Sequence, residues 1–161
     1  HTLAVSLFDG KKVSSRIMVL REFDLKKRIM RFHTDHRAEK IQYISNQSSV
    51  SVLGYDPALK VQLKLQGNID VHYDDEVTQM AWEGSSNRSK KCYTVKGGSS
   101  KQIKEPGDYD IQEFEPESGY KNFSVLIFSF NSLEYLYLKR SGHRRALHDW
   151  ENEYSSTWLV P

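Results

Sequence analysis

The sequence contains a single cysteine, four prolines and no long hydrophobic run. One cysteine, Cys92, excludes a disulfide within the chain and is typical of a reducing cytoplasm. No apolar stretch approaches the roughly 20 residues that a bilayer crossing needs, so we expect no membrane partner. The first residues, "HTLAVSLFDG", alternate like a strand, and we expect no signal peptide among them. These features favour a cytoplasmic protein.

The net charge is also small. It is +2 at pH 7, which is too little to argue for nucleic acid as a partner. At 161 residues, 38% of them hydrophobic and 27% charged, the chain fits one soluble domain over residues 1–161. The bases are clustered, since residues 11–40 hold ten bases and four acids, whereas residues 105–118 hold six acids and no base. This pattern indicates either a localised anion site or random clustering on a solvated surface.

Short segments of strand character dominate the chain. They cover residues 2–8, 13–23, 28–34, 49–55, 60–73, 123–130, 133–140, 144–151 and 156–161. Asp9 and Gly10 form a hairpin signal between the first two segments. So many strands at short intervals predict a mainly β barrel or sandwich. Residues 84–118 are rich in Gly, Ser, Lys and acids, which predicts a long loop with a short helix near 88–93.

Two segments have helical character. Residues 35–46 place Ala38, Ile41 and Ile44 on one stripe, with Thr34 or Asp35 available as the N-cap. Residues 74–83 form the second segment, which begins with acids that suit a helix N-terminus. We therefore expect a barrel with a few helices.

Two bases, Arg37 and Lys40, fall in the first turns of the predicted helix 35–46. Positive charge is unfavourable there, because a helix N-terminus already carries about half a positive charge. A bound phosphate monoester would make both positive charges favourable at this place. Free backbone N–H groups would be further donors to it, and Arg16 is a candidate third basic side chain. The alternative is that both bases snorkel and pair with acids elsewhere. The charge pattern leaves the two interpretations open.

Four motifs in order are more specific than any one of them. "RIMVLR", "FHTDHRAEK", "VQLKLQG" and a terminal "HRRALHDW…WLVP" together resemble the pyridoxamine 5′-phosphate oxidase-like, FMN-binding split-barrel family, most closely its general-stress flavoproteins. The resemblance implies a six-stranded Greek-key barrel and a homodimer with FMN in clefts between the subunits. It also implies flavin-dependent oxidation or reduction of a small molecule whose identity the sequence does not reveal.

The resemblance further implies which residues bind FMN. Arg16 and Lys40 match phosphate or ribityl contacts, Arg37 lies on the same turn as Lys40, and Gln62 matches a glutamine that reaches the flavin ring. The other implied contacts are Met18, Val19 and Leu20 through backbone groups, Arg21 facing the active site, and His33 and Thr34 after the third strand.

The C-terminal motif departs from the family pattern. Where the oxidase has Arg-Leu-His-Asp-Arg, this chain has Ala146 and Trp150 in place of the two arginines, and Arg145 lies one position away. Arg145 and His148 remain candidate substrate residues, and Leu136 stands where the oxidase has a tryptophan near the flavin. Residues 80–93 lack the oxidase's set for the substrate phosphate, so oxidation of vitamin B6 is not expected. A non-catalytic flavin- or haem-binding module is the alternative function.

The sequence also bears on two other classes of site. His33 and His36 flank Asp35, but no third ligand is spaced to complete a metal site, so no metal is expected. Four aromatic residues near the C-terminal bases are typical of nucleic-acid-binding barrels. Their alternation with apolar residues favours a core and a dimer interface instead.

Overall fold

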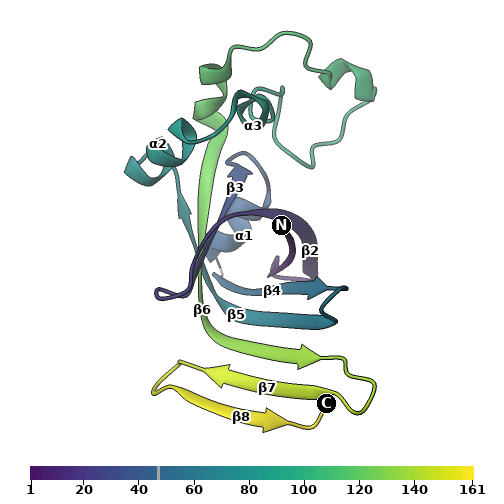
Figure 1. The fold of residues 1–161 in the computed structure, drawn as a ribbon. Coiled ribbons are helices and arrows are strands. Elements are labelled where there is room, and N and C mark those ends of the chain that lie inside the picture. Colours follow the sequence, from purple (N-terminus) through teal and green to yellow (C-terminus); the bar gives the residue numbers. More distant parts are fainter. Residues whose placement is uncertain (47) are drawn as a thin grey trace.

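The computed structural model describes residues 1–46 and 48–161 of the chain. Within these residues, eight strands form one antiparallel sheet, six of which close into a barrel (Figure 1). The strands are β1 (Thr2–Phe8), β2 (Val13–Asp24), β3 (Ile29–Asp35), β4 (Ser49–Asp56), β5 (Val61–His72), β6 (Phe123–Tyr137), β7 (Arg144–Asp149) and β8 (Ser155–Leu159). The barrel follows the order β3-β2-β1-β4-β5-β6 and closes where β6 pairs with β3. The predicted six-stranded barrel is therefore confirmed.

The helices lie outside the barrel wall. They are α1 (Lys40–Asn46), α2 (Glu76–Glu83) and α3 (Asn87–Lys91), with 3-10 turns η1 (Pro106–Tyr109) and η2 (Pro116–Asn122). Figure 1 shows α2, α3 and the long segment after them at one end of the molecule, and the β7–β8 hairpin at the other. In the part of the chain that the structure describes, no helix is both long and apolar enough to cross a membrane.

The main hydrophobic core lies inside the barrel and extends to the end that α1 covers. Alternate strand residues point inward, and among them Val5, Phe32 and Phe128 are fully buried. Ile41 and Ile44 of α1 pack onto the same cluster, so this helix covers one end of the barrel. The predicted stripe of Ala38, Ile41 and Ile44 is confirmed because all three are buried.

Two predicted elements differ in extent. The predicted helix 35–46 begins only at Lys40, because Asp35 still pairs with Phe123 as the last residue of β3. Residues 36–39 turn between the strand and the helix, so neither Thr34 nor Asp35 is its N-cap. The predicted strands 123–130 and 133–140 are one strand, β6, which continues through a register shift opposite Gln66 and Gly67.

The barrel is split between β2 and β3. The two strands pair from Leu20 and Phe32 toward the turn that joins them. Beyond Leu20, β2 pairs only with β1, over Val13–Val19, while the last residues of β3 pair with β6. The strands therefore diverge, and a cleft opens between the first half of β2, the end of β3 and the start of α1.

Candidate functional site

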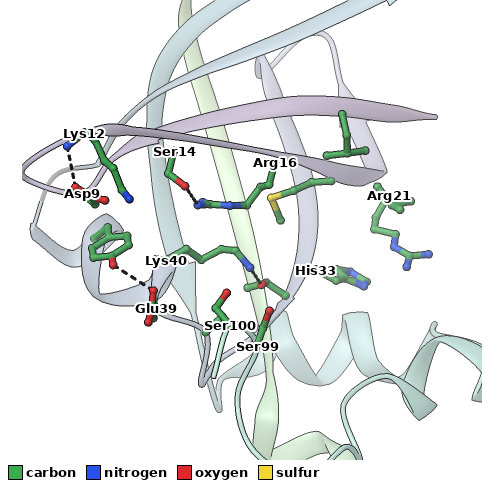
Figure 2. A pocket seen from close by; sticks show the side chains of 16 residues that line it. Asp9, Lys12, Ser14, Arg16, Arg21, His33, Glu39, Lys40, Ser99 and Ser100 are labelled. Carbon is green, nitrogen blue, oxygen red and sulfur yellow. Dashed lines mark hydrogen bonds between the residues drawn. The ribbon is translucent and has the colours of Figure 1, made fainter. Parts of the chain in front are cut away.

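The cleft between β2, β3 and α1 has a volume of about 640 Å³ and is lined mainly by polar side chains. Figure 2 shows Arg16 and Lys40 in its middle, with Asp9 and Lys12 at one end and Arg21 and His33 at the other. Strand alternation explains the placement of Arg16. It shares the inward face of β2 with Met18, whereas Ile17 and Val19 on either side are exposed.

Arg16 and Lys40 are two partly buried cations that lie close enough to repel each other. Burial lowers the pKa of Lys40, and the positive charge of Arg16 lowers it further, against a smaller opposing effect of Asp35. Burial also lowers the pKa of Arg16. The side-chain partners of both are neutral hydroxyls: Arg16 Nη2 donates to Ser14 Oγ at 2.7 Å, and Lys40 Nζ donates to Thr34 Oγ1 at 2.8 Å.

One hydrogen-bond donor of Arg16 has no partner in the described chain. Among the described residues, no hydrogen-bond partner is present for Arg16 Nη1, although the atom is buried. A buried charged donor without a partner is costly, and such groups in native proteins usually have a ligand or water as a partner. The carboxylates that line the cleft are partly occupied, since Asp9 accepts two backbone N–H groups of its turn and Glu39 accepts from Tyr43. The middle of the cleft is therefore suited to an anion.

At its other end the cleft adjoins a second hollow of about 340 Å³, and both are lined by Arg21 and His33. The hollow is also lined by Arg31 and by serine hydroxyls at the end of α2 and the start of α3. Burial lowers the pKa of His33 to about 4, with further lowering by the cations Arg21 and Arg31. His33 is therefore neutral at pH 7, and its buried Nε2 has no partner within residues 1–46 and 48–161.

Arg37 does not line the cleft. Its guanidinium forms two bonds to the Asp35 carboxylate, Nε to Oδ1 at 3.0 Å and Nη2 to Oδ2 at 2.6 Å, and Nη2 also donates to the Val95 carbonyl at 3.0 Å. Of the two predicted bases, Arg37 thus pairs with an acid and Lys40 does not. The pairing interpretation is therefore correct for Arg37, and the phosphate interpretation stays a prediction for Lys40.

The backbone N–H groups around the start of α1 are largely used within the chain. Arg37 N donates to Asp35 Oδ1 and Ala38 N to the Asp35 carbonyl, while Ile41 N and Gln42 N bond to carbonyls just before them. These four N–H groups are therefore not available to a ligand, and the predicted use of backbone donors at the helix start is limited to Glu39 and Lys40.

The open edge of β2 also presents main-chain N–H and C=O groups to the cleft. Leu20 N donates to the His1 carbonyl on the β1 side. Because successive strand residues turn their N–H and C=O groups to alternate sides, those of Val19 and Ile17 point away from β1, toward the cleft. Of the predicted backbone contacts Met18, Val19 and Leu20, Val19 therefore faces the cleft with its main chain. Met18 lines the cleft, and Leu20 lines an apolar hollow elsewhere.

The structure places three of the matched residues on another part of the sheet. Gln62, Leu136 and Arg145 are consecutive neighbours across β5, β6 and β7. Arg145 Nη2 bonds to Glu134 Oε1 at 2.9 Å, and none of the three lines the cleft. His148 lies further along β7, stacked on Trp150 and Tyr154. The residues matched by the family resemblance thus form two separate groups in one chain.

Ser99 and Ser100 line the cleft and were missed by sequence reasoning. Figure 2 shows them on the side of Lys40 that faces away from Arg16. They belong to the long segment predicted as a loop, which returns over the start of α1. The only sequence signal was the Gly97–Gly98 pair before them, which indicates a tight backbone path but not its destination.

Part of the chain is similar in sequence to one known family. Residues 3–73 match the family model described as pyridoxamine 5′-phosphate oxidase, FMN-binding domain. That segment contains both sides of the cleft, from Arg16 to Lys40, and also Gln62. No curated protein sequence matches the chain.

Solved structures share the fold. A pyridoxamine 5′-phosphate oxidase-related, FMN-binding protein from Nostoc punctiforme is 22% identical, with a TM-score of 0.84 over 99% of this chain and 88% of that one. PhzG from Burkholderia lata is 15% identical, with a TM-score of 0.80 over 99% and 82%. General Stress Protein 26 from Bacillus anthracis is 17% identical, with a TM-score of 0.56 over 83% and 82%. The family model over residues 3–73 bears out the predicted resemblance, and the solved structures show that the chain has the split-barrel fold that they share.

Proposed function

We propose that this protein binds FMN non-covalently in the cleft between β2, β3 and α1, and that it is a flavin-dependent oxidoreductase acting on a small molecule. The observation that carries the proposal is the facing pair Arg16 and Lys40, with a buried guanidinium N–H group without a partner in the described chain. The family model and the Nostoc relative are both described as FMN-binding, which supports the choice of anion.

The residues fit the two ends of such a cofactor. Arg16 and Lys40 would hold the dianionic phosphate, which would offset their mutual repulsion and accept a hydrogen bond from the unpartnered Nη1 of Arg16. The open edge of β2 at Val19 and Ile17 offers main-chain groups to the polar rim of the ring, and the buried Met18 packs beside them. The flavin supplies the electron chemistry, while the protein binds it, orients it and limits access of water.

An FMN titration of the apoprotein tests the proposal. Flavin fluorescence should be quenched with a one-to-one stoichiometry per chain, and riboflavin without its phosphate should bind at least tenfold more weakly because it forms no charge-assisted bonds. Replacing Arg16 by alanine should weaken FMN binding, whereas Lys27→Ala, an exposed base on the β2–β3 turn, is the matched control. An absence of FMN uptake by the purified parent would overturn the assignment.

We place the substrate in the adjoining hollow. Burial, followed by the charges of Arg21 and Arg31, keeps His33 neutral. Arg31 is paired with Glu22 at 3.0 Å, so the positive charge of the hollow comes mainly from Arg21. This favours a small molecule that carries a carboxylate or phosphate. Replacing Arg21 by glutamine should raise the KM of an anionic substrate more than the Kd for FMN, and screening anionic compounds against FMN-loaded protein is the direct search.

We also propose that the protein is a homodimer, with each FMN held between two subunits. Gln62, Leu136 and Arg145 lie apart from the cleft of their own chain, so they reach a flavin only if a second copy presents them. An apolar outer face supports the pairing. Ile17, Ala4 and Leu53 are direct neighbours across β2, β1 and β4, and Ile17 is 69% exposed.

The dimer can be tested by sedimentation of the apoprotein. Leu53→Glu places a charge in this outer face and should shift the protein to a monomer that binds FMN more weakly. Leu25→Glu changes an equally apolar residue on the β2–β3 turn and is the matched control. A parent that sediments as a monomer at micromolar concentration contradicts the proposal.

The cytoplasm is the proposed compartment, since the exposed thiol of Cys92 suits a reducing environment.

One observation favours the alternative, a flavin-binding module without catalytic activity. His33 is the only histidine lining the cleft within the described chain, and its pKa of about 4 makes it a poor proton donor at pH 7. The residues of the cleft therefore bind and orient but offer no evident acid. Steady turnover of NADH or NADPH by the FMN-loaded protein would exclude this alternative.

A further inference from the structure

Arg37 bridges the start of α1 to the long segment that follows α3. Its guanidinium is held on Asp35 by two bonds and donates to the Val95 carbonyl at 3.0 Å. Side-chain bonding to Asp35 raises the pKa of Arg37, so the bridge is charged at every relevant pH. The planar fork of arginine suits this task, because it can bind a carboxylate with one edge and still reach a carbonyl.

Residues 95–100, which we name the strap, lie against the backbone of Arg37. A Cβ atom at Gly98 would lie 2.5 Å from the Arg37 carbonyl oxygen and 2.8 Å from the Arg37 Cβ, so only glycine permits this approach. Gly97 has φ +76° and Ser100 has φ +75°, left-handed values that turn the strap toward the cleft. Packing on Arg37 therefore places Ser99 and Ser100 at the cleft, where both line it.

The strap has few other attachments. It contains no helix or strand, and the bond from Arg37 to Val95 is its one hydrogen bond to the rest of the described chain. A segment with so few contacts moves easily unless it is tied down. The position of Ser99 and Ser100 thus depends on Arg37 and on the close packing at Gly98.

We propose that Arg37 is a positioning residue, which holds the strap across the cleft so that Ser99 and Ser100 cover Lys40 on the side away from Arg16 and keep its ammonium directed at the anionic group. The inference rests on the proposed phosphate position. Figure 2 shows the two serines on one side of Lys40 and Arg16 on the other, so the strap and β2 lie on opposite sides of Lys40. Arg37 itself does not touch the ligand.

Two variants test the role of Arg37 from opposite sides of the contact. Arg37→Lys removes the fork while keeping the positive charge beside Asp35. Gly98→Ala keeps the Asp35–Arg37 pair and pushes the strap away, because the added Cβ would overlap the Arg37 carbonyl. Gly107→Ala is the matched control, since it lies in the same long segment with nothing within 4 Å of an added Cβ.

The measurements are the FMN affinity and the rate of tryptic cleavage at Lys96 and Lys101, two exposed bases at the strap. In the parent, saturating FMN should slow cleavage at both sites at least fivefold. In Arg37→Lys and Gly98→Ala, this protection should disappear and FMN should bind about tenfold more weakly, with an unchanged melting temperature of the apoprotein. Gly107→Ala should behave as the parent does.

The outcomes separate this inference from the proposed function. If the parent binds FMN and both variants bind it equally well with full protection, the positioning role is wrong and the proposed function stands. If the parent binds no FMN, the proposed function fails, and inorganic phosphate replaces FMN as the probe. Protection of Lys101 by phosphate in the parent but not in Gly98→Ala then supports the strap, and its absence in the parent overturns it.

Discussion

Replacing Lys40 by methionine separates a ligand-binding role from a structural one. The substitution keeps an unbranched apolar stem beside the buried Ile41 and Ile44 and removes only the charged end. It removes one hydrogen bond, from Nζ to Thr34 Oγ1. It also removes a cation whose pKa is lowered by burial and by Arg16, that is, a charge that the apoprotein holds at a cost.

The two consequences have opposite signs. In the apoprotein, the lost bond to Thr34 is worth about 1 kcal/mol, and relief of the repulsion with Arg16 offsets it, so the free energy of unfolding should change by less than about 1 kcal/mol. In the complex, the variant lacks a charge-assisted bond to phosphate, which is worth about 1.5–3 kcal/mol. The Kd for FMN should therefore rise by about 10- to 150-fold.

Urea unfolding of the apoprotein and FMN titration measure the two quantities on the same preparation. Lys27→Met, on the exposed β2–β3 turn, is the control and should change neither. The reasoning fails if Lys40→Met binds FMN as the parent does. It also fails if the apoprotein loses several kcal/mol of stability, because Lys40 would then be part of the fold and not of a ligand site.

Three further outcomes are expected. FMN affinity should fall as pH rises through the lowered pKa of Lys40, because only the protonated ammonium binds phosphate, and the fall should be absent in Lys40→Met when FMN is titrated between pH 7 and 10. Ile41→Asp should reduce the free energy of unfolding in urea by more than about 3 kcal/mol, whereas Gln42→Asp on the exposed side of the same helix should change it little. Glu117→Ala should lower the melting temperature, because it leaves the buried ammonium of Lys90 without its partner at 2.7 Å, and a melting temperature equal to the parent's would mean that water replaces this contact.

The strands of the barrel were predictable because their signals are local. Alternation along β1 and β2, with the Asp9–Gly10 turn between them, determines the hairpin before any tertiary contact is known. The helix start was not predictable to the same degree. Asp35 pairs with Phe123, a partner 88 positions away, and this pairing extends β3 at the expense of the first helical turn.

The site was half predictable for a similar reason. Arg16, His33, Thr34 and Lys40 come from neighbouring parts of the chain, so one ordered set of motifs contained them all. Ser99 arrives from a long segment whose path depends on a single close approach, at Gly98. Composition indicates that such a segment is a loop, but the strand and helix periods say nothing about where a loop returns.

Arg37 and Lys40 have different partners because of the acids that lie close to them. Both bases precede the same buried stripe, and Asp35 is the carboxylate close to both. Asp35 binds Arg37 through two oxygens, since a guanidinium matches a carboxylate better than an ammonium does. Lys40 is left to face Arg16 with hydroxyl partners only, and two half-buried cations that repel each other do not stabilise a fold. A doubly negative group from outside the chain would offset this repulsion, and the pairing of Arg37 with Asp35 leaves Lys40 free for the proposed phosphate.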